Sequence, residues 1–390
     1  MGANENEGGC PRISVVTVCL NSAETLERTI LSVRGQDYQD REHIIIDGQS
    51  TDGTVEIIAK YGQSGDLAYW VSEPDGGIYE AMNKGIAKAT GDVVTLLSSN
   101  DYYLKPDCLR RVADYFRANP TSDIVSAQMA LIDENGFFIG NAEKRELEEI
   151  HYRMVCNHPA TFVKRGLFGQ VGFFDTRYRI AADYDWLLRA YHRGFCFMNI
   201  DEALVAFHMD GVSTTEWRQT ADEVYMISTT ANPPAALAQY RSDIDGYYQA
   251  KIRWYSAGEQ KKEFVKSKYG ELREGILRLT GKGTEIGIFG FGAWGRECFA
   301  LLKQLDIDCR LIIDNDEKKW QANDAAKVGP IDLLEGFCGT VIIAVDGGEA
   351  AITQQIEARF AMIGFVLVSF RQIRDMMESL ATGQGKGGET

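Results

Sequence analysis

Residues 12–62 read RISVVTVCLNSAETLERTILSVRGQDYQDREHIIIDGQSTDGTVEIIAKYG, and this stretch decides the fold. The β-branched run at 12–20 is typical of a buried parallel strand. The segment 21–36 follows it with apolar residues at helical spacing and then a glycine, which predicts a helix. Residues 43–47 predict a second strand and residues 54–62 a second helix. This order predicts an α/β fold whose parallel sheet is covered by helices.

The composition is that of a soluble globular protein, with 45% hydrophobic and 25% charged residues. The formal net charge of −15 argues against a nucleic-acid partner, because such surfaces collect Lys and Arg. The eight cysteines form no CxxC pair, so a structural zinc site is not expected. The N-terminus lacks the features of a signal peptide, and no window resembles a membrane span. We therefore expect a cytoplasmic protein, with peripheral contact at the inner face of the membrane left open.

Changes in composition divide the 390 residues into segments, because one hydrophobic core rarely supports a chain of this length. We expect flexible tails at 1–11 and 383–390. The first domain is predicted at 12–215, a helical connector without obvious chemistry at 216–282, and a smaller Rossmann-like α/β domain at 283–382.

Three successive predicted strands of the first domain end in aspartate. Asp47 ends one strand, Asp75 stands in the stretch 72–85 before two glycines and Lys84, and Asp101 ends the run LLSSND. Taken alone, Asp47 fits an Asx turn, and Asp75 fits a Pro-Asp-Gly turn that precedes an ordinary exposed lysine. Taken together, the three aspartates predict one site, because ligands of open α/β sheets bind at the carboxyl ends of the strands.

Four ordered motifs resemble those of a known family. They are TVCLN (17–21), IIIDGQSTDGT (44–54), SEPDGGIYEAMNKGIAKATGD (72–92) and LLSSNDYY (96–103), and they look like the successive motifs of the family 2 glycosyltransferases. Members of that family are inverting enzymes of the GT-A fold, which take a sugar from a nucleotide-diphosphate sugar. The resemblance implies transfer to a glycan or lipid-linked acceptor hydroxyl, in polysaccharide or glycolipid assembly.

The resemblance also implies roles for single residues. Asp101 would hold a divalent cation, Mn²⁺ or Mg²⁺, although the DxD signature of the family here reads S-N-D and Asn100 departs from it. One carboxylate can suffice, because Mg²⁺ often takes its other ligands from phosphates and water. The residues implied in binding the donor are Thr17, Asn21, Asp47, Asp75, Asn83, Lys84, Ser99 and Asn100.

A later acidic segment, RIAADYDWLLRAYHRG (179–194), resembles the part of the family that carries the catalytic base. The resemblance implies Asp183 as that base, with Asp185 as the second choice; the plainer alternative for Asp183 is a helix cap. His158 would reach the acceptor or the diphosphate, or is structural. His208 is a less favoured candidate for the metal shell.

The C-terminal stretch carries its own motif. GFGAWG (290–295) fits G-x-G-x-x-G between a predicted strand and a predicted helix, which makes Gly290, Gly292 and Gly295 candidates for nucleotide contact and Asp314 a candidate for ribose binding. The module would bind a nucleotide or dinucleotide, bind a nucleotide sugar, or bind nothing and only pack against a neighbour.

Three functions compete. The favoured one is an inverting, metal-dependent glycosyltransferase. The second is a non-catalytic nucleotide-sugar scaffold or sensor with a degenerate DxD, and the third is an NAD-dependent oxidoreductase that acts through the C-terminal domain. The motifs specify neither the sugar, the nucleobase nor an oligomeric state.

Overall fold

The computed structural model describes residues 10–133, 136–281, 285–290, 292–314, 327–329, 334, 337, 339–345, 351–354, 356 and 366–382. The predicted tail at 383–390 and residues 1–9 of the predicted N-terminal tail lie outside these ranges. The chain divides into two compact units. The first covers Met1–Glu134 and Ile139–Arg253, and the second covers Asn135–Phe138 and Trp254–Thr390.

Four parallel strands form one half of the sheet in the first unit. They are β1 (Ile13–Cys19), β2 (Arg41–Asp47), β3 (Tyr69–Ser72) and β4 (Val93–Leu96). The register places Cys19 opposite Asp47 and Asp47 opposite Ser72, so these strands end side by side. The predicted α/β fold with a parallel sheet is confirmed.

The sheet continues with strands of mixed direction, in the order β3-β2-β1-β4-β8-β6-β9-β5, and β7 also pairs with β6. The pairs β4·β8, β8·β6 and β9·β5 are antiparallel, whereas β6 and β9 run parallel. The bounds are β5 (Tyr102–Tyr103), β6 (Ile124–Ile132), β7 (Phe138–Asn141), β8 (Thr161–Lys164) and β9 (Phe197–His208).

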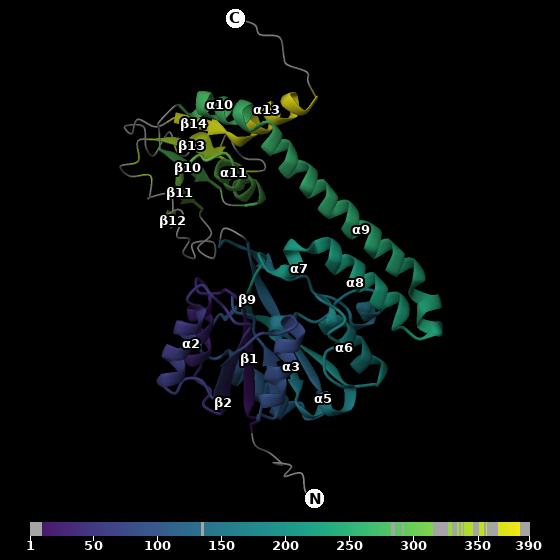
Figure 1. Cartoon of the computed structure of the whole chain (residues 1–390). Helices are drawn as coiled ribbons and strands as arrows, with labels where there is room; N and C mark the ends of the chain where they lie inside the picture. Colours follow the sequence, from purple (N-terminus) through teal and green to yellow (C-terminus); the bar gives the residue numbers. More distant parts are fainter. Residues whose placement is uncertain are drawn as a thin grey trace, which may run out of the picture. The chain divides into compact units, whose positions relative to one another are not determined.

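Helices cover both faces of the parallel half. Ile45 of β2 packs with α1 (Leu26–Arg34) and α2 (Thr54–Gln63) in one core cluster. Its neighbour Ile46 shares another cluster with α3 (Ile78–Lys88), which lies along β1 and β2 (Figure 1). Successive side chains of a strand point to opposite faces, and strands buried on both faces need uninterrupted apolar runs.

Further helices complete the first unit. These are α4 (Cys108–Ala118), α5 (Gly166–Val171), α6 (Ala182–His192), α7 (Val212–Thr215) and α8 (Trp217–Thr230), with 3-10 turns at Leu147–His151 and His158–Ala160. Then follow α9 (Pro234–Ser267) and α10 (Tyr269–Thr280), and the two compact units divide inside α9, after Arg253. No helix of the described residues is long and apolar enough to cross a membrane.

The second unit contains a parallel sheet in the order β12-β11-β10-β13-β14. This is the order of one half of a doubly wound nucleotide-binding fold plus the next two strands. The bounds are β10 (Ile286–Phe289), β11 (Cys309–Ile313), β12 (Lys327–Gly329), β13 (Thr340–Ile343) and β14 (Val366–Ser369), with helices α11 (Ala293–Gln304) and α13 (Phe370–Thr382).

Candidate active site

Asp47 stands at the carboxyl end of β2 and is fully buried. Its Oδ2 accepts hydrogen bonds from the Ser50 backbone N–H (2.9 Å) and the Ser72 hydroxyl (2.6 Å), while Oδ1 accepts one from the Ser50 hydroxyl (2.5 Å). Asp47 therefore ties the turn after β2 to the end of β3, and its oxygens are occupied within the protein.

Asp75 lies beside that turn. Its Oδ1 accepts a hydrogen bond from the Gly77 N–H at 2.9 Å, and a Cβ added to Gly48 would lie 2.9 Å from its Oδ2. The structure thus brings Asp75 against the residue that follows Asp47. This arrangement agrees with the expectation that the strand ends share one edge.

Asn83 and Lys84 of α3 are both engaged. The Asn83 amide donates to the Phe174 carbonyl (2.9 Å) and accepts from the Phe174 N–H (3.0 Å), so it fixes the chain after α5. Lys84 Nζ forms ion pairs with Glu73 at 3.0 Å and Glu80 at 3.2 Å. Of these two residues only Lys84 is charged, and a diphosphate could compete with Glu73 and Glu80 for its ammonium group.

Thr17 and Asn21 hold the first strand end in place. The Thr17 hydroxyl is buried and lies 3.0 Å from His43 Nε2. Asn21 has a φ of 51°, a conformation that Asn tolerates better than most residues, and its Oδ1 accepts from the Thr51 N–H at 2.9 Å. Thr17 is thus a core contact in this structure, whereas Asn21 links two exposed loops.

The S-N-D segment after β4 makes three different kinds of contact. The Ser99 hydroxyl lies 2.8 Å from the Ser22 hydroxyl, and the Asn100 amide donates to Asp210 Oδ1 at 2.9 Å. Asp101 is fully buried; its Oδ1 accepts from the His208 N–H at 3.1 Å, and its Oδ2 has no hydrogen-bond partner in the described part of the chain. Burial raises the pKa of Asp101 to about 8.

Arg28 of α1 stands next to this segment. Its Nη2 donates to the Asn100 carbonyl at 3.1 Å and to His208 Nε2 at 2.9 Å, and its guanidinium carbon lies 4.5 Å from the ring centroid of Tyr102. Arg can only donate, so His208 Nε2 must accept. Burial, followed by the charge of Arg28, lowers the pKa of His208 to about 4, which keeps the ring neutral at pH 7.

These contacts bear on the predicted divalent cation. Asp101 is sealed from solvent, and Asn100 is a neutral amide that donates to Asp210. The Nε2 of His208, which could otherwise bind a metal, accepts a hydrogen bond from Arg28. Among the described residues no group of three or more His, Cys, Asp or Glu side chains could hold a metal ion. The side chains present do not assemble a cation site by themselves, and the metal role of Asp101 stays a prediction.

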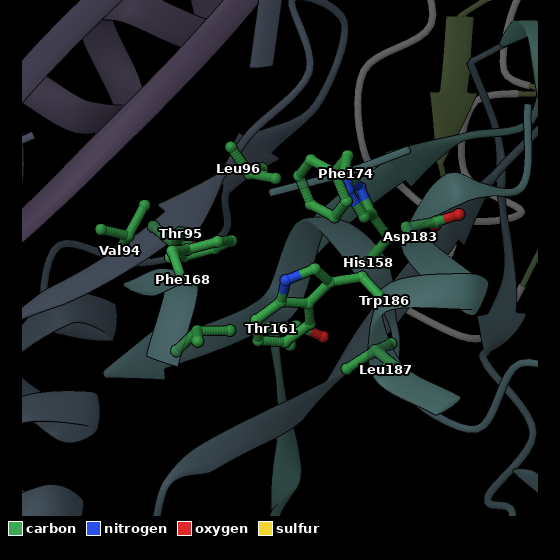
Figure 2. Close-up of a pocket in the computed structure, with 11 residues that line it drawn as sticks. Val94, Thr95, Leu96, His158, Thr161, Phe168, Phe174, Asp183, Trp186 and Leu187 are labelled. Carbon is green, nitrogen blue, oxygen red and sulfur yellow. The ribbon is translucent and has the colours of Figure 1, made fainter. Parts of the chain in front are cut away.

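A small cavity, partly open to solvent, lies between β4, β8, α5 and α6, with Asp183 and His158 among the residues that line it (Figure 2). His158 Nε2 is buried and has no hydrogen-bond partner within the described ranges. The rest of the lining is mostly apolar: Val94, Thr95, Leu96, Thr161, Val163, Phe168, Phe174, Trp186 and Leu187. Two of the three residues that the sequence singled out for the acceptor side, Asp183 and His158, therefore line one cavity.

Asp183 is held at the start of α6. Its Oδ1 accepts from the Tyr184 N–H at 2.9 Å and lies 2.9 Å from the Tyr79 hydroxyl, which also donates to the Ile180 carbonyl at 2.5 Å. Burial, and then the charge of Asp183, raises the pKa of Tyr79 well above its usual value, so Tyr79 stays a donor. Asp183 Oδ2 makes no hydrogen bond among the described residues and can accept a proton.

Asp185 points elsewhere. It is buried, its Oδ2 accepts from Arg189 Nε at 2.8 Å, and it does not line the cavity that Asp183 lines. Burial raises the pKa of Asp185, although the ion pair with Arg189 opposes the shift. The structure separates the two aspartates and gives only Asp183 access to the cavity.

Two residues that the motifs did not single out contribute directly to this geometry. Tyr79 lies inside the motif GIYEAMNKG, where its spacing from the other apolar residues predicts only that it lies on the buried face of a helix. Arg28 lies in a segment that reads as an ordinary amphipathic helix, so its position beside Asn100 carries no sequence signal.

In the second unit, the glycine motif lies where β10 leads into α11. Gly290 has a φ of +87°, and a Cβ added to it would lie 2.4 Å from the Val345 side chain. Gly292 precedes α11, and Gly295 is buried within that helix. Asp314 follows β11 and is buried. These four residues share the carboxyl edge of the sheet, and nucleotide binding there stays a prediction.

Known glycosyltransferases match the part of the chain that forms most of the first unit. The family model described as "Glycosyl transferase family 2" matches residues 14–175. An uncharacterised glycosyltransferase of Mycobacterium tuberculosis is 36% identical over 182 residues, which is 46% of this chain and 69% of that protein. A PGL/p-HBAD biosynthesis glycosyltransferase of Mycobacterium bovis is 33% identical over 200 residues, which is 51% of this chain and 74% of that protein.

Two solved structures resemble the fold. Staphylococcus aureus TarS 1–349 in complex with UDP has a TM-score of 0.50 at 18% identity, over 67% of this chain and 80% of that one. The mannosyltransferase PcManGT of Pyrobaculum calidifontis, solved with GDP-Man and Mn²⁺, has a TM-score of 0.50 at 18% identity, over 76% and 85%. The sequence matches, with the same GT-A fold in these structures, show that the chain is a glycosyltransferase and belongs to glycosyltransferase family 2.

Proposed function

We propose that the chain transfers a sugar, with inversion, from a nucleotide-diphosphate sugar to a hydroxyl of a glycan or lipid-linked acceptor. The observation that carries this proposal is the placement of Asp183. One of its oxygens contacts Tyr79 and Tyr184, and Asp183 is one of the residues that line the cavity, together with His158.

In the proposed reaction the acceptor oxygen attacks the anomeric carbon while Asp183 Oδ2 takes its proton. The bond from that carbon to the diphosphate oxygen breaks on the opposite side, so the configuration inverts. Tyr79 and the Tyr184 N–H hold Oδ1 and thereby orient Oδ2. The first turn of α6 stabilises the carboxylate, and His158 borders the same space.

The donor is assigned to the carboxyl edge formed by the ends of β1 to β4. Asp75 and the turn after Asp47 are in contact there, and Lys84 and Asn21 lie on the loops and helix that follow. The charge of the leaving diphosphate would be offset by a divalent cation bound with the donor or by a cationic side chain in its place. Polysaccharide or glycolipid assembly is the proposed setting, with peripheral membrane contact.

The test is the variant Asp183→Asn. We expect kcat for sugar transfer to fall by about 10²-fold or more, because general base catalysis contributes on that scale, while the melting temperature stays close to wild type. Donors are chosen first by a thermal-shift screen of UDP-, GDP-, dTDP- and CMP-sugars with and without Mn²⁺. Asp201→Asn is the matched control, since Asp201 is an exposed aspartate whose ion pair among the described residues is with Lys144. Transfer by Asp183→Asn at the wild-type rate would contradict the assignment.

A further inference from the structure

We propose that Arg28 binds the diphosphate of the sugar donor and supplies positive charge that a divalent cation would otherwise supply. The inference rests on the proposed function, because it assumes that the donor diphosphate lies at the end of β4. It extends that function by assigning a residue to the anionic part of the donor.

Arg28 is exposed, and the groups to which it donates hydrogen bonds or against which it stacks are neutral. The contacts are the Asn100 carbonyl (3.1 Å), His208 Nε2 (2.9 Å) and the ring of Tyr102 (4.5 Å). Among the described residues no carboxylate forms an ion pair with Arg28. By contrast, Arg34 on the same helix pairs with Asp66 at 3.2 Å. Asp101 is close enough to interact electrostatically with Arg28, but it is buried and makes no ion pair with it. The exposed guanidinium of Arg28 is therefore unpaired among the residues that the structure describes, in a chain whose net charge is −15.

The neighbouring residue fixes Arg28 to the S-N-D segment. The Thr29 hydroxyl lies 2.9 Å from the Ser99 carbonyl and 2.7 Å from the Asp101 carbonyl, so the second turn of α1 is attached to the loop after β4. Arg28 thus stands beside Asn100 on a rigid element. A guanidinium held this way loses little freedom on binding, and its planar fork suits phosphate oxygens.

The charges at this strand end favour an arginine over a metal. Asn100 is neutral, and Asp101 is sealed from solvent. The carboxylate of Asp210 accepts a hydrogen bond from the Asn100 amide. A divalent cation prefers carboxylate and phosphate oxygens, whereas it would be repelled by the unpaired guanidinium of Arg28. A diphosphate is attracted to the same guanidinium.

Calorimetry on the full chain tests the proposal, with UDP and GDP as probes and the nucleosides uridine and guanosine as references, in EDTA and in Mn²⁺. We expect the wild type to bind one of the diphosphates in EDTA. Arg28→Gln should weaken that binding at least about tenfold, because a hydrogen bond to a charged group is lost, and should leave nucleoside binding unchanged. Arg28→Lys, which keeps the charge, should fall between the two. Arg34→Gln is the matched control on the same helix and should bind like the wild type.

Two outcomes would overturn the role of Arg28. One is diphosphate binding by Arg28→Gln in EDTA that equals the wild type. The other is wild-type binding that requires Mn²⁺ and does not respond to Arg28 substitution, which would leave the proposed transferase function standing. Failure of the wild type to bind either diphosphate under both conditions would instead contradict the donor site itself. Unchanged nucleoside affinity shows that each variant is folded.

Discussion

His43 illustrates how burial alone sets the behaviour of a single residue. The side chain is 4% exposed in the centre of β2, and Nε2 lies 3.0 Å from the Thr17 hydroxyl. Burial, followed by the nearby charge of Arg41, lowers the pKa of His43 from 6.5 to about 3. In the unfolded chain the same imidazole keeps its ordinary pKa. Between these two values the unfolded state binds a proton that the native state does not.

We therefore predict that His43 makes the first unit less stable as the pH falls from about 6.5 towards 3. His43→Gln keeps a polar group near Thr17 and removes the titration. Urea unfolding between pH 6 and 4 should show a wild-type stability that falls more steeply, by up to about 1.4 kcal/mol per pH unit, than that of the variant. Above pH 8 the two slopes should coincide. Equal slopes across the whole range would mean that His43 is charged in the native protein.

The sequence motifs predict which residues come together at the site better than they predict the contacts and burial of each residue. The approach of Asp75 to the turn after Asp47 follows from the parallel order of the strands, and it could be predicted. The sealing of Asp101 by β9 and the contact of Arg28 with His208 join residues more than 100 positions apart. No local pattern encodes such distances, because they depend on the complete tertiary packing.

At the scale of elements, α8 does more than connect domains. Glu223 is buried, and its carboxylate accepts hydrogen bonds from the backbone N–H groups of Arg179 (3.0 Å), Ile180 (2.8 Å) and Ala181 (2.9 Å). These residues immediately precede α6, which carries Asp183. The helical segment was expected to contain no obvious chemistry, since a single glutamate on a helix gives no signal of a distant loop that it holds.

Glu223 is predicted to be a positioning residue for Asp183. Glu223→Gln keeps the size but removes the charge, and Glu223→Ala removes all three acceptor contacts. Both should lower kcat, by at least about tenfold in the alanine variant, with a smaller change in KM for the donor, because a displaced base affects the chemical step. Steady-state kinetics with melting temperatures measures this. Asp222→Asn is the control, since Asp222 contacts Tyr248 of α9 at 2.8 Å and not the loop. A variant that loses stability but keeps kcat would argue for a purely structural role.

At the scale of the whole molecule, each compact unit has hydrophobic clusters of its own. In the first unit they join β1, β2 and β4 to helices on both faces, and in the second unit one cluster contains Leu272, Phe299 and Ile373 from three helices. The strand and helix patterns predicted both α/β sheets. The division within α9 could not be predicted from composition, because the helix continues across Arg253 and Trp254 without a glycine or proline at that point.

Because the two units have separate cores, we expect two unfolding transitions. A substitution at Gly339 should shift one of them and not the other. This residue precedes β13, and a Cβ there would overlap the backbone carbonyl of Glu285, which also accepts the Thr340 N–H at 2.7 Å. Neither backbone segment can move without breaking the β10·β13 pairing.

Gly339→Ala should lower the transition of the second unit by several degrees in scanning calorimetry and leave the first transition unchanged. Gly270→Ala, in α10 with no atom near the added Cβ, is the control and should not destabilise the second unit. A single transition that shifts as a whole in Gly339→Ala would show that the two cores unfold together through α9.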